Sequence, residues 1–225
     1  MAILRKRRNF VGMVFITGAL SIITMGCATP TIESNPTMMP HFDKPILSRV
    51  VLADATYEKD VIREYDKPFF AKIVRNLRKE IGKTNLMSDL VFERDMPQKG
   101  YGVPGKQVYL LRYRATEFRY EDTMNCFMTE HYRTIWMNFE MKIYDVTNAP
   151  TVKITTEEYL NVYDTFELKP LRHETYKVEV TSGPIGSNYA LGEKGVERDN
   201  AMASDLARQL IKNSAQAIQE TLTAR

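Results

Sequence analysis

The feature that most constrains the fold of this chain is an alternation of apolar and polar side chains through YRTIWMNFEMKIYDV, residues 132–146. Successive side chains of a β-strand point to opposite faces, so a period of two is that of a strand. One face is apolar and the other mostly polar: Ile135, Met137, Phe139, Met141 and Ile143 against Thr134, Trp136, Asn138, Glu140 and Lys142. The pattern predicts a long, half-buried strand in an antiparallel sheet.

Other segments carry weaker strand signals. Residues 107–118, QVYLLRYRATEF, alternate in the same way, and we expect them to pair with the strand at 132–146. The remaining strand predictions are residues 46–55, 90–95, 151–164 and 174–180.

Two segments have the period of a helix. In residues 66–82 the apolar side chains form one stripe, and Asp66 is expected to cap the helix, with Pro68 in the first turn and Gly82 just past the end. Residues 200–223 carry one narrow face of small and aliphatic side chains. The order of elements predicts an α+β fold, a largely antiparallel sheet of 4–5 strands with two helices packed on one face.

The N-terminus has the three parts of an export signal. Residues 5–8 are all basic, residues 9–25 carry no charge, and a polar, proline-rich segment follows Cys27. A membrane-spanning helix needs about 20 mainly apolar residues, and this apolar region is shorter and interrupted. We therefore divide the chain into a signal peptide (1–26), a proline-rich tether (27–45) and a periplasmic domain (46–225).

Residues Thr24, Met25, Gly26 and Cys27 resemble the lipobox of bacterial lipoproteins, in which the cysteine is acylated and the chain is cut just before it. Gly26 and Cys27 match the two most demanding positions, whereas Thr24 stands where an aliphatic residue is usual. The resemblance implies that Cys27 is the lipidation site. Since Ala28 rather than Asp follows it, the resemblance also implies a place at the periplasmic face of the outer membrane. The alternatives are an ordinary cleaved signal and an uncleaved anchor, with Cys27 incidental in both.

Cleavage after residue 26 removes the apparent basicity of the chain. The sequence has 31 Lys and Arg against 28 Asp and Glu, a net charge of +3, and four of the basic residues lie in 1–26. Their removal leaves 27 against 28, a net charge of −1. Composition therefore gives no case for nucleic-acid binding. Acylation of Cys27 leaves Cys126 as the single thiol, so no intramolecular disulfide is expected.

The sequence lacks a recognisable catalytic motif. It has neither a G-x-S-x-G nucleophile turn nor a phosphate loop, so we predict no enzyme activity and no cofactor. A copper site is one hypothesis for residues 120–131, where Met124, Cys126, Met128 and His131 offer sulfur and imidazole ligands. Their spacing matches no established metal motif, which favours a hairpin tip or a partner contact.

Aromatic and arginine side chains predict a surface for a protein partner. These residue types anchor protein interfaces. Five of them lie on, or at the ends of, the two strands expected to pair: Trp136, Tyr132, Arg112, Arg114 and Arg133. The alternative places Trp136 under a helix and the arginines in ion pairs.

As a whole, the arrangement resembles the small α+β lipoproteins of Gram-negative envelopes, such as the YajG-like lipoproteins and the auxiliary lipoproteins of ABC transport systems. The resemblance implies a non-catalytic accessory subunit that docks onto a larger envelope assembly, such as secretion, transport or flagellar-type machinery. Self-association is a further alternative. A carrier of a lipid or another small apolar ligand is the second functional hypothesis, and it predicts an apolar cavity between sheet and helices.

Replacing Cys27 tests the lipid anchor. Cys27→Ser removes the thiol that is acylated, so we expect the protein to leave the membrane fraction or to remain an unprocessed precursor. Globomycin, which blocks cleavage of lipoprotein signals, is expected to accumulate precursor of the unaltered chain. Fractionation and immunoblotting measure both outcomes. Normal membrane retention of the serine variant would contradict the anchor.

Overall fold

The computed structural model describes residues 37–96, 101, 103–124, 127–148, 169–186 and 192–224. Cys27, Cys126, the predicted signal, the tether up to residue 36 and the predicted strand 151–164 lie outside the described residues. The strands are β1 (Ile46–Leu52), β2 (Thr56–Tyr57), β3 (Met87–Phe92), β4 (Val108–Met124), β5 (Glu130–Asp145), β6 (Arg172–Thr181) and β7 (Ile185–Gly186).

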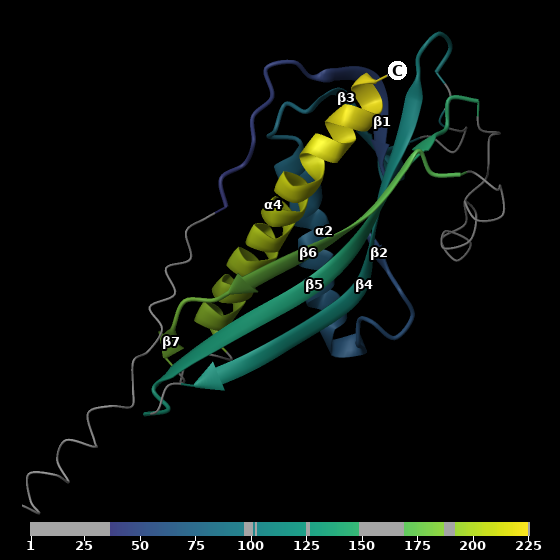
Figure 1. Cartoon of the computed structure of the whole chain (residues 1–225). Coiled ribbons are helices and arrows are strands. Elements are labelled where there is room, and N and C mark those ends of the chain that lie inside the picture. Colours follow the sequence, from purple (N-terminus) through teal and green to yellow (C-terminus); the bar gives the residue numbers. More distant parts are fainter. Residues whose placement is uncertain are drawn as a thin grey trace, which may run out of the picture.

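These strands form one mixed sheet with the order β3-β1-β4-β5-β6, in which β2 also pairs with β4 and β7 with β5 (Figure 1). The prediction of a largely antiparallel sheet of 4–5 strands is wrong, because the sheet has seven strands and β1 runs parallel to both β3 and β4. A helix lies between β1 and β3 in the sequence, and such a crossover returns the chain to the end where β1 began. The strands β2 and β7 have two residues each, too few to show a period.

The predicted pairing of the two long strands is confirmed, since β4 and β5 form an antiparallel hairpin. A β-bulge between Ala115 and Glu117 adds one residue to β4. Before the bulge the odd-numbered side chains of β4 face the core, and after it Phe118 and Tyr120 do. The bulge thus keeps apolar side chains on one face along the whole hairpin.

Two helices accompany the sheet, α2 (Lys67–Ile81) and α4 (Glu193–Thr223). Asp66 does not cap α2: its side chain makes no cap hydrogen bond and accepts instead from Arg63 Nε at 3.3 Å. A 3₁₀ turn at Glu64–Asp66 runs directly into α2, so Asp66 already has helical backbone angles rather than those of a cap. Within the part of the chain that the structure describes, neither helix has the length and apolar character needed to cross a bilayer.

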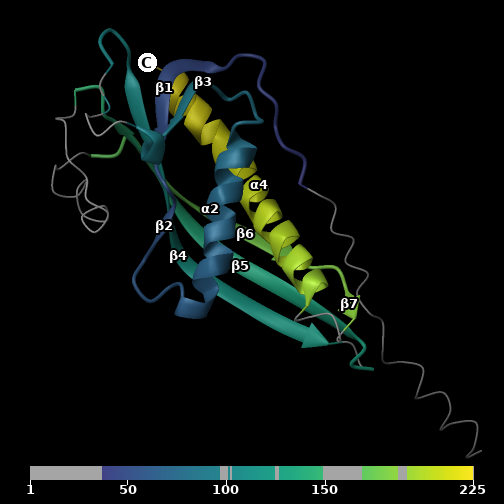
Figure 2. The ribbon, with the colours of Figure 1, turned by 180° about the vertical axis from the view of Figure 1, so that it is seen from behind.

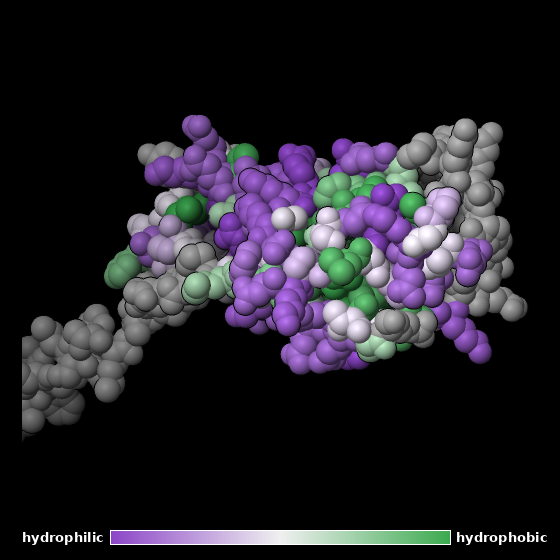
Figure 3. All heavy atoms as spheres, turned by 90° about the horizontal axis from the view of Figure 1, so that it is seen from above, coloured by the Kyte–Doolittle hydropathy of each residue, from purple (hydrophilic) through white to green (hydrophobic). Residues whose placement is uncertain are grey.

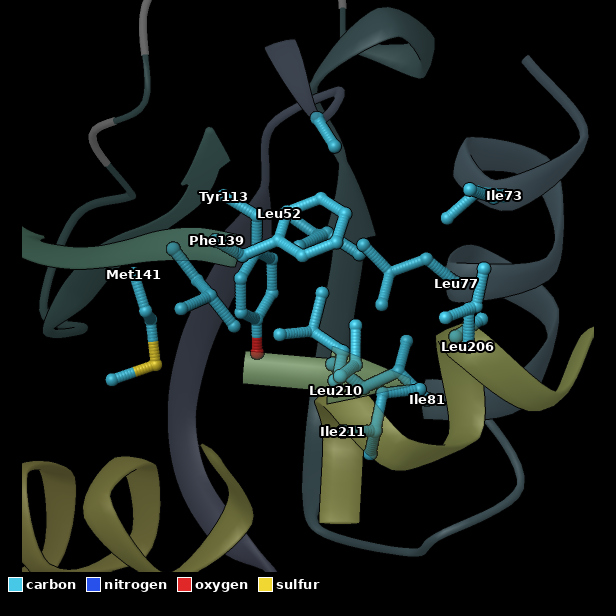
Figure 4. Close-up of a cluster of buried hydrophobic side chains, with 14 of the residues drawn as sticks. Leu52, Ile73, Leu77, Ile81, Tyr113, Phe139, Met141, Leu206, Leu210 and Ile211 are labelled. Atoms are coloured by element: carbon cyan, nitrogen blue, oxygen red, sulfur yellow. The ribbon is translucent and has the colours of Figure 1, made fainter. Parts of the chain in front are cut away.

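Both helices cover the same face of the sheet, as predicted (Figures 1 and 2). Figure 4 shows Leu77 of α2 and Leu210 of α4 gathered with Phe139 of β5, and all three are buried. The predicted inward face of β5 is confirmed, since Ile135, Met137, Phe139, Met141 and Ile143 are all buried. Burial of such side chains stabilises a fold by about 1.5–3 kcal/mol each, so this layer holds the domain together.

A smaller apolar cluster lies on the opposite face of the sheet, near β1. It consists of Val51, Ala53, Tyr101, Val108, Leu110, Tyr144 and Val146. The segment between β3 and β4 covers it through Tyr101 and the partly buried Met96 and Val103. The helix-free face is thus apolar only at one end.

One polar contact crosses the main core. The Tyr113 hydroxyl of β4 lies 2.7 Å from Ser214 Oγ of α4, and Ser214 Oγ lies 2.8 Å from the carbonyl oxygen of Leu210. A carbonyl only accepts, so Ser214 donates to Leu210 and accepts from Tyr113. Burial raises the pKa of Tyr113, which therefore keeps its proton for this bond.

Ser214→Ala is expected to destabilise the protein more than Tyr113→Phe. The alanine leaves the Tyr113 hydroxyl buried without an acceptor, which costs about 1–3 kcal/mol in the free energy of unfolding. The phenylalanine leaves Ser214 bonded to Leu210, so its cost is about 1 kcal/mol. Urea unfolding followed by circular dichroism measures both, and the double variant should recover part of the Ser214→Ala loss. Equal costs would argue against this arrangement.

Candidate interaction surface

Beyond the smaller apolar cluster near β1, the face of the sheet turned away from both helices carries mainly polar side chains of β4, β5 and β6. Trp136 lies on this side, because Ile135 and Met137 on either side of it are buried against the helices. The register of the sheet places Arg119 of β4 and Glu179 of β6 opposite Trp136. The alternative that puts Trp136 under a helix therefore does not hold for α2 and α4.

We call this surface the open face. It comprises the outward side chains of β4 from Arg114 to Arg119, of β5 from Thr134 to Lys142 and of β6 from His173 to Glu179. Its charges have both signs. Arg119, whose side chain is 72% exposed, pairs with Glu117, while Lys142 Nζ and His173 Nε2 each lie 3.5 Å from a carboxylate oxygen of Glu140. The open face thus combines one large aromatic side chain with mixed charges.

Arg114 and Arg112 leave β4 on the same side as Trp136, but both already interact with their own chain. Arg114 Nη1 lies 3.8 Å from Glu58 Oε1 and keeps about a third of its side chain exposed. Arg112 is buried, and its charge acts on the carboxyl group of Glu93. Arg112 therefore offers little surface to a partner.

Arg133, another predicted partner residue, faces the helices. Its guanidinium donates to both carboxylate oxygens of Asp122, at 2.7 and 2.9 Å, and to Asp199 of α4 at 3.3 Å. These bonds attach the hairpin to α4, so the Arg133 side chain stabilises the fold and does not contribute to the open face. Arg133 and the inward-facing Ile135 are two residues apart in the same strand, so the period of two predicts that both side chains face the helices.

Tyr132, the remaining predicted residue, is buried near the end of the hairpin. Its hydroxyl donates to Glu130 Oε2 at 2.9 Å. Of the five predicted residues, the structure therefore brings only Trp136 and Arg114 together on the open face with exposed area. Arg119 joins them.

The copper hypothesis does not fit the position of His131. Its Nδ1 lies 2.8 Å from Arg198 Nη1, and because a guanidinium only donates, Nδ1 accepts. The ring proton then lies on Nε2, 3.7 Å from Asp122 Oδ1, so neither nitrogen offers a free lone pair to a metal. Met124 and Met128 are exposed at the hairpin end, and Cys126 lies outside the described residues. Among the described residues, no group of three or more His, Cys, Asp or Glu side chains is placed to hold a metal ion.

A buried carboxyl group that sequence reasoning missed lies beside Arg112. Glu93 accepts a hydrogen bond from the Tyr101 hydroxyl. Burial raises the pKa of Glu93 to about 7, although the Tyr101 bond and the charge of Arg112 both act to lower it. We predicted a strand through 90–95, but β3 ends at Phe92 and Glu93 begins a 3₁₀ turn. The sequence around Glu93 has no motif that marks it.

Side chains of α4 close the outer edge of β6. Gln209 Nε2 donates to the carbonyl of Glu179 at 2.7 Å, and its Oε1 accepts from the Glu179 N–H at 3.1 Å. Asn213 Nδ2 donates to the carbonyl of Lys177 at 3.4 Å. These amides take the positions of a neighbouring strand, and such protection disfavours pairing with another chain at this edge.

A groove of about 590 Å³ lies between the start of α4 and the connection from β6 to β7. Apolar side chains such as Met202 and Ile185 line it together with charged ones such as Lys194 and Asp205. Its Arg208 also donates to Glu80 of α2 at 3.3 Å. Burial alone would raise the pKa of Glu80, but the bonds from Lys83 and Arg208 hold it below its ordinary value. The groove thus has a mixed lining of apolar and charged side chains and lies at the edge of the fold.

No protein-family model matches the sequence, and no curated protein matches it. Solved structures do resemble it. The protein CT253 of Chlamydia trachomatis, at 9% identity, aligns with 79% of this chain and 99% of its own at a TM-score of 0.40. A minor lipoprotein of Acinetobacter baumannii, at 13% identity, aligns with 80% and 94% at 0.32. Rare lipoprotein B of Shewanella oneidensis, at 13% identity, aligns with 77% and 99% at 0.31.

These structural neighbours include bacterial lipoproteins. Their TM-scores are too low to carry an argument about function.

The raised pKa of Glu93 predicts a dependence of stability on pH. In the unfolded chain the group titrates near 4.5 and in the folded one near 7. Its stabilising contribution is thus complete below pH 4.5 and is lost as the pH rises through 7. The loss is roughly 3 kcal/mol in the free energy of unfolding. Urea unfolding between pH 4.5 and 8.5 measures it.

Glu93→Gln is the matched control, because an amide accepts the Tyr101 hydrogen bond and does not titrate. The difference in stability between the two proteins should change across this pH window. A constant difference would contradict a raised pKa for Glu93.

Proposed function

We propose that this chain is a non-catalytic accessory lipoprotein of the Gram-negative envelope, anchored through Cys27 at the periplasmic face of the outer membrane. Its open face docks onto a protein of a larger assembly. The three-part N-terminal signal that ends in Gly26 and Cys27 supports the anchor. The kind of assembly, whether for secretion, transport or flagellar function, and the YajG-like or transport-auxiliary type remain predictions from the sequence resemblance.

One observation supports the open face as the docking surface. The only tryptophan of the chain, Trp136, lies on the side of the sheet opposite both helices and next to the exposed Arg119. Tryptophan and arginine are enriched among the residues that contribute most to protein interfaces. In the view of Figure 3 the described surface is mainly hydrophilic, and hydrophobic residues form small separate groups on it.

The charges of the open face indicate the chemistry of the partner. Cations such as Arg119 and Lys177 alternate with anions such as Glu117 and Glu179. A polyanion or an anionic membrane would meet repulsion from half of these groups, whereas a protein surface with a complementary mixed pattern fits them. Because α4 closes the edge of β6, the partner meets the face of the sheet there rather than adding a strand.

The second hypothesis, a carrier of a lipid or small apolar ligand, is less well supported. It predicts an apolar cavity between sheet and helices, but Tyr113, Phe139 and Leu210 meet there without exposed surface (Figure 4). The groove at the start of α4 lies at the edge of the fold, and charged side chains such as Lys194 and Asp205 share its lining with apolar ones.

In-cell photo-crosslinking tests the docking surface. A photoreactive residue in place of Thr175, which is exposed on the open face, is expected to give an adduct with a partner protein. Trp136→Ala in the same chain should lower the yield of that adduct by about tenfold or more, because it removes the central anchor. Mass spectrometry identifies the adduct and immunoblotting measures its yield.

The matched control is Gln216, which is exposed on α4 on the other side of the sheet. A photoreactive residue there should give no such adduct. Absence of an adduct from Thr175, or an equal yield from Gln216, would overturn docking through the open face. Retention of the protein in the membrane fraction reports on the anchor independently.

A further inference from the structure

The end of the long hairpin exposes three large apolar side chains. Met124 is 56% exposed, Phe127 77% and Met128 72%. Met128 also has a φ of 54°, the left-handed conformation of a tight turn, which turns the chain back into β5. Single exposed apolar residues are ordinary, but three at one protruding turn form a contact site. We call these three residues the hairpin tip.

The hairpin tip lies at the same end of the domain as the start of α4. Met124 stands opposite His131 in the register of the sheet, and His131 bonds Arg198 in the second turn of α4. Thr37, the first described residue, donates its backbone N–H to Asp205 Oδ1 at 3.2 Å. Seven residues of helix separate Arg198 from Asp205, about 10 Å along the axis. The described chain thus begins beside α4, about 10 Å along the helix axis from the residue that contacts the base of the hairpin tip.

The length of the tether limits how far the domain can stand from the membrane. Ten residues lead from Cys27 to Thr37. A fully extended chain spans at most about 3.5 Å per residue, so Thr37 lies within about 35 Å of the anchor point. The bilayer surface is therefore within reach of the end of the domain that carries the hairpin tip.

A bilayer fits this tip better than a protein does. A stable protein interface buries about 800 Å² on each partner, far more than three side chains supply. Apolar side chains enter a bilayer surface without the need for a complementary shape, and the anchor makes the contact intramolecular, so a weak one is populated. Of the three acidic residues beside the tip, Asp122 pairs with Arg133 and Glu130 accepts from Tyr132, while Glu121 is exposed three residues before Met124.

We propose that the hairpin tip, Met124, Phe127 and Met128, inserts into the surface of the bilayer that holds Cys27 and thereby orients the domain. This inference rests on the proposed lipid anchor. The open face stays clear of the bilayer, because Trp136 lies five residues along β5 from His131, about 17 Å from the tip end of the strand.

Quenching of tryptophan fluorescence by brominated lipid tests the proposal. Because the chain has one tryptophan, Phe127→Trp combined with Trp136→Phe moves the only indole to the tip. The full-length lipidated protein is reconstituted into phosphatidylcholine vesicles with or without brominated acyl chains. We expect bromine to lower the emission of the moved indole by about twofold or more, since a contact quencher reaches only groups in the bilayer. The unaltered protein, with its indole at Trp136, is the matched control and should show equal emission in both vesicles.

Vesicle flotation of the same samples separates the two proposals. Protein that floats with the vesicles but shows no bromine quenching at position 127 keeps its anchor and overturns the tip contact. If that unquenched indole is also shielded from iodide, a protein contact occupies the tip in place of lipid. Protein that fails to float overturns the anchor and, with it, this inference.

Discussion

The packing of α4 against α2 and one face of the sheet is the contact on which the rest of the structure depends. Ala203 and Ala207 of α4 have no exposed surface, and their small side chains let the helix lie close to its neighbours. Polar contacts then fix its position: Ser214 reaches Tyr113 across the core, and Arg208 reaches Glu80 between the helices. Because both helices lie on one side, the sheet acquires a filled face and an open face.

This division also determines what each charged group can do. Arg133 and His131 stand on the filled side, where Asp199 and Arg198 of α4 engage them, so they serve to hold the hairpin. Trp136 lies three residues after Arg133, on the opposite side of the strand, and has no such neighbour from α2 or α4. Strand β5 therefore contributes side chains that hold the fold together on one face and candidate binding residues on the other.

The sequence predicts those parts of the fold in which a periodic pattern of apolar residues continues over many positions. Residues 132–146 have a pattern of two and 66–82 one of three to four, and each indicates both an element and its buried side. The parallel position of β1 has no such signal, because it depends on where α2 returns the chain. The start of α4 is missed by seven residues, since its first two turns carry few apolar side chains.

The residues of the candidate site also differ in how much of their position the sequence predicts. The outward direction of Trp136 follows from its place in the alternation, whereas the burial of Arg112 depends on a segment distant in sequence that brings Glu93 and Tyr101 near it. A single strand pattern gives the direction of a side chain but not what covers it. Covering is a tertiary property, set by a connection between β3 and β4 whose turn-rich sequence has no period.

A tether and a binding face alone leave one physical problem, the orientation of the domain. With Cys27 as the proposed anchor, a chain of ten residues would hold the domain near the membrane but allow it to turn, and a freely turning domain would present its open face to a partner only part of the time. A contact between the hairpin tip and the bilayer removes much of that freedom before the partner binds. Since the tip and Trp136 lie on one hairpin, the proposed bilayer contact would set the height and direction of the open face together. Preorganisation of this kind lowers the entropic cost of docking, so in the proposed arrangement the hairpin tip and the open face would act together.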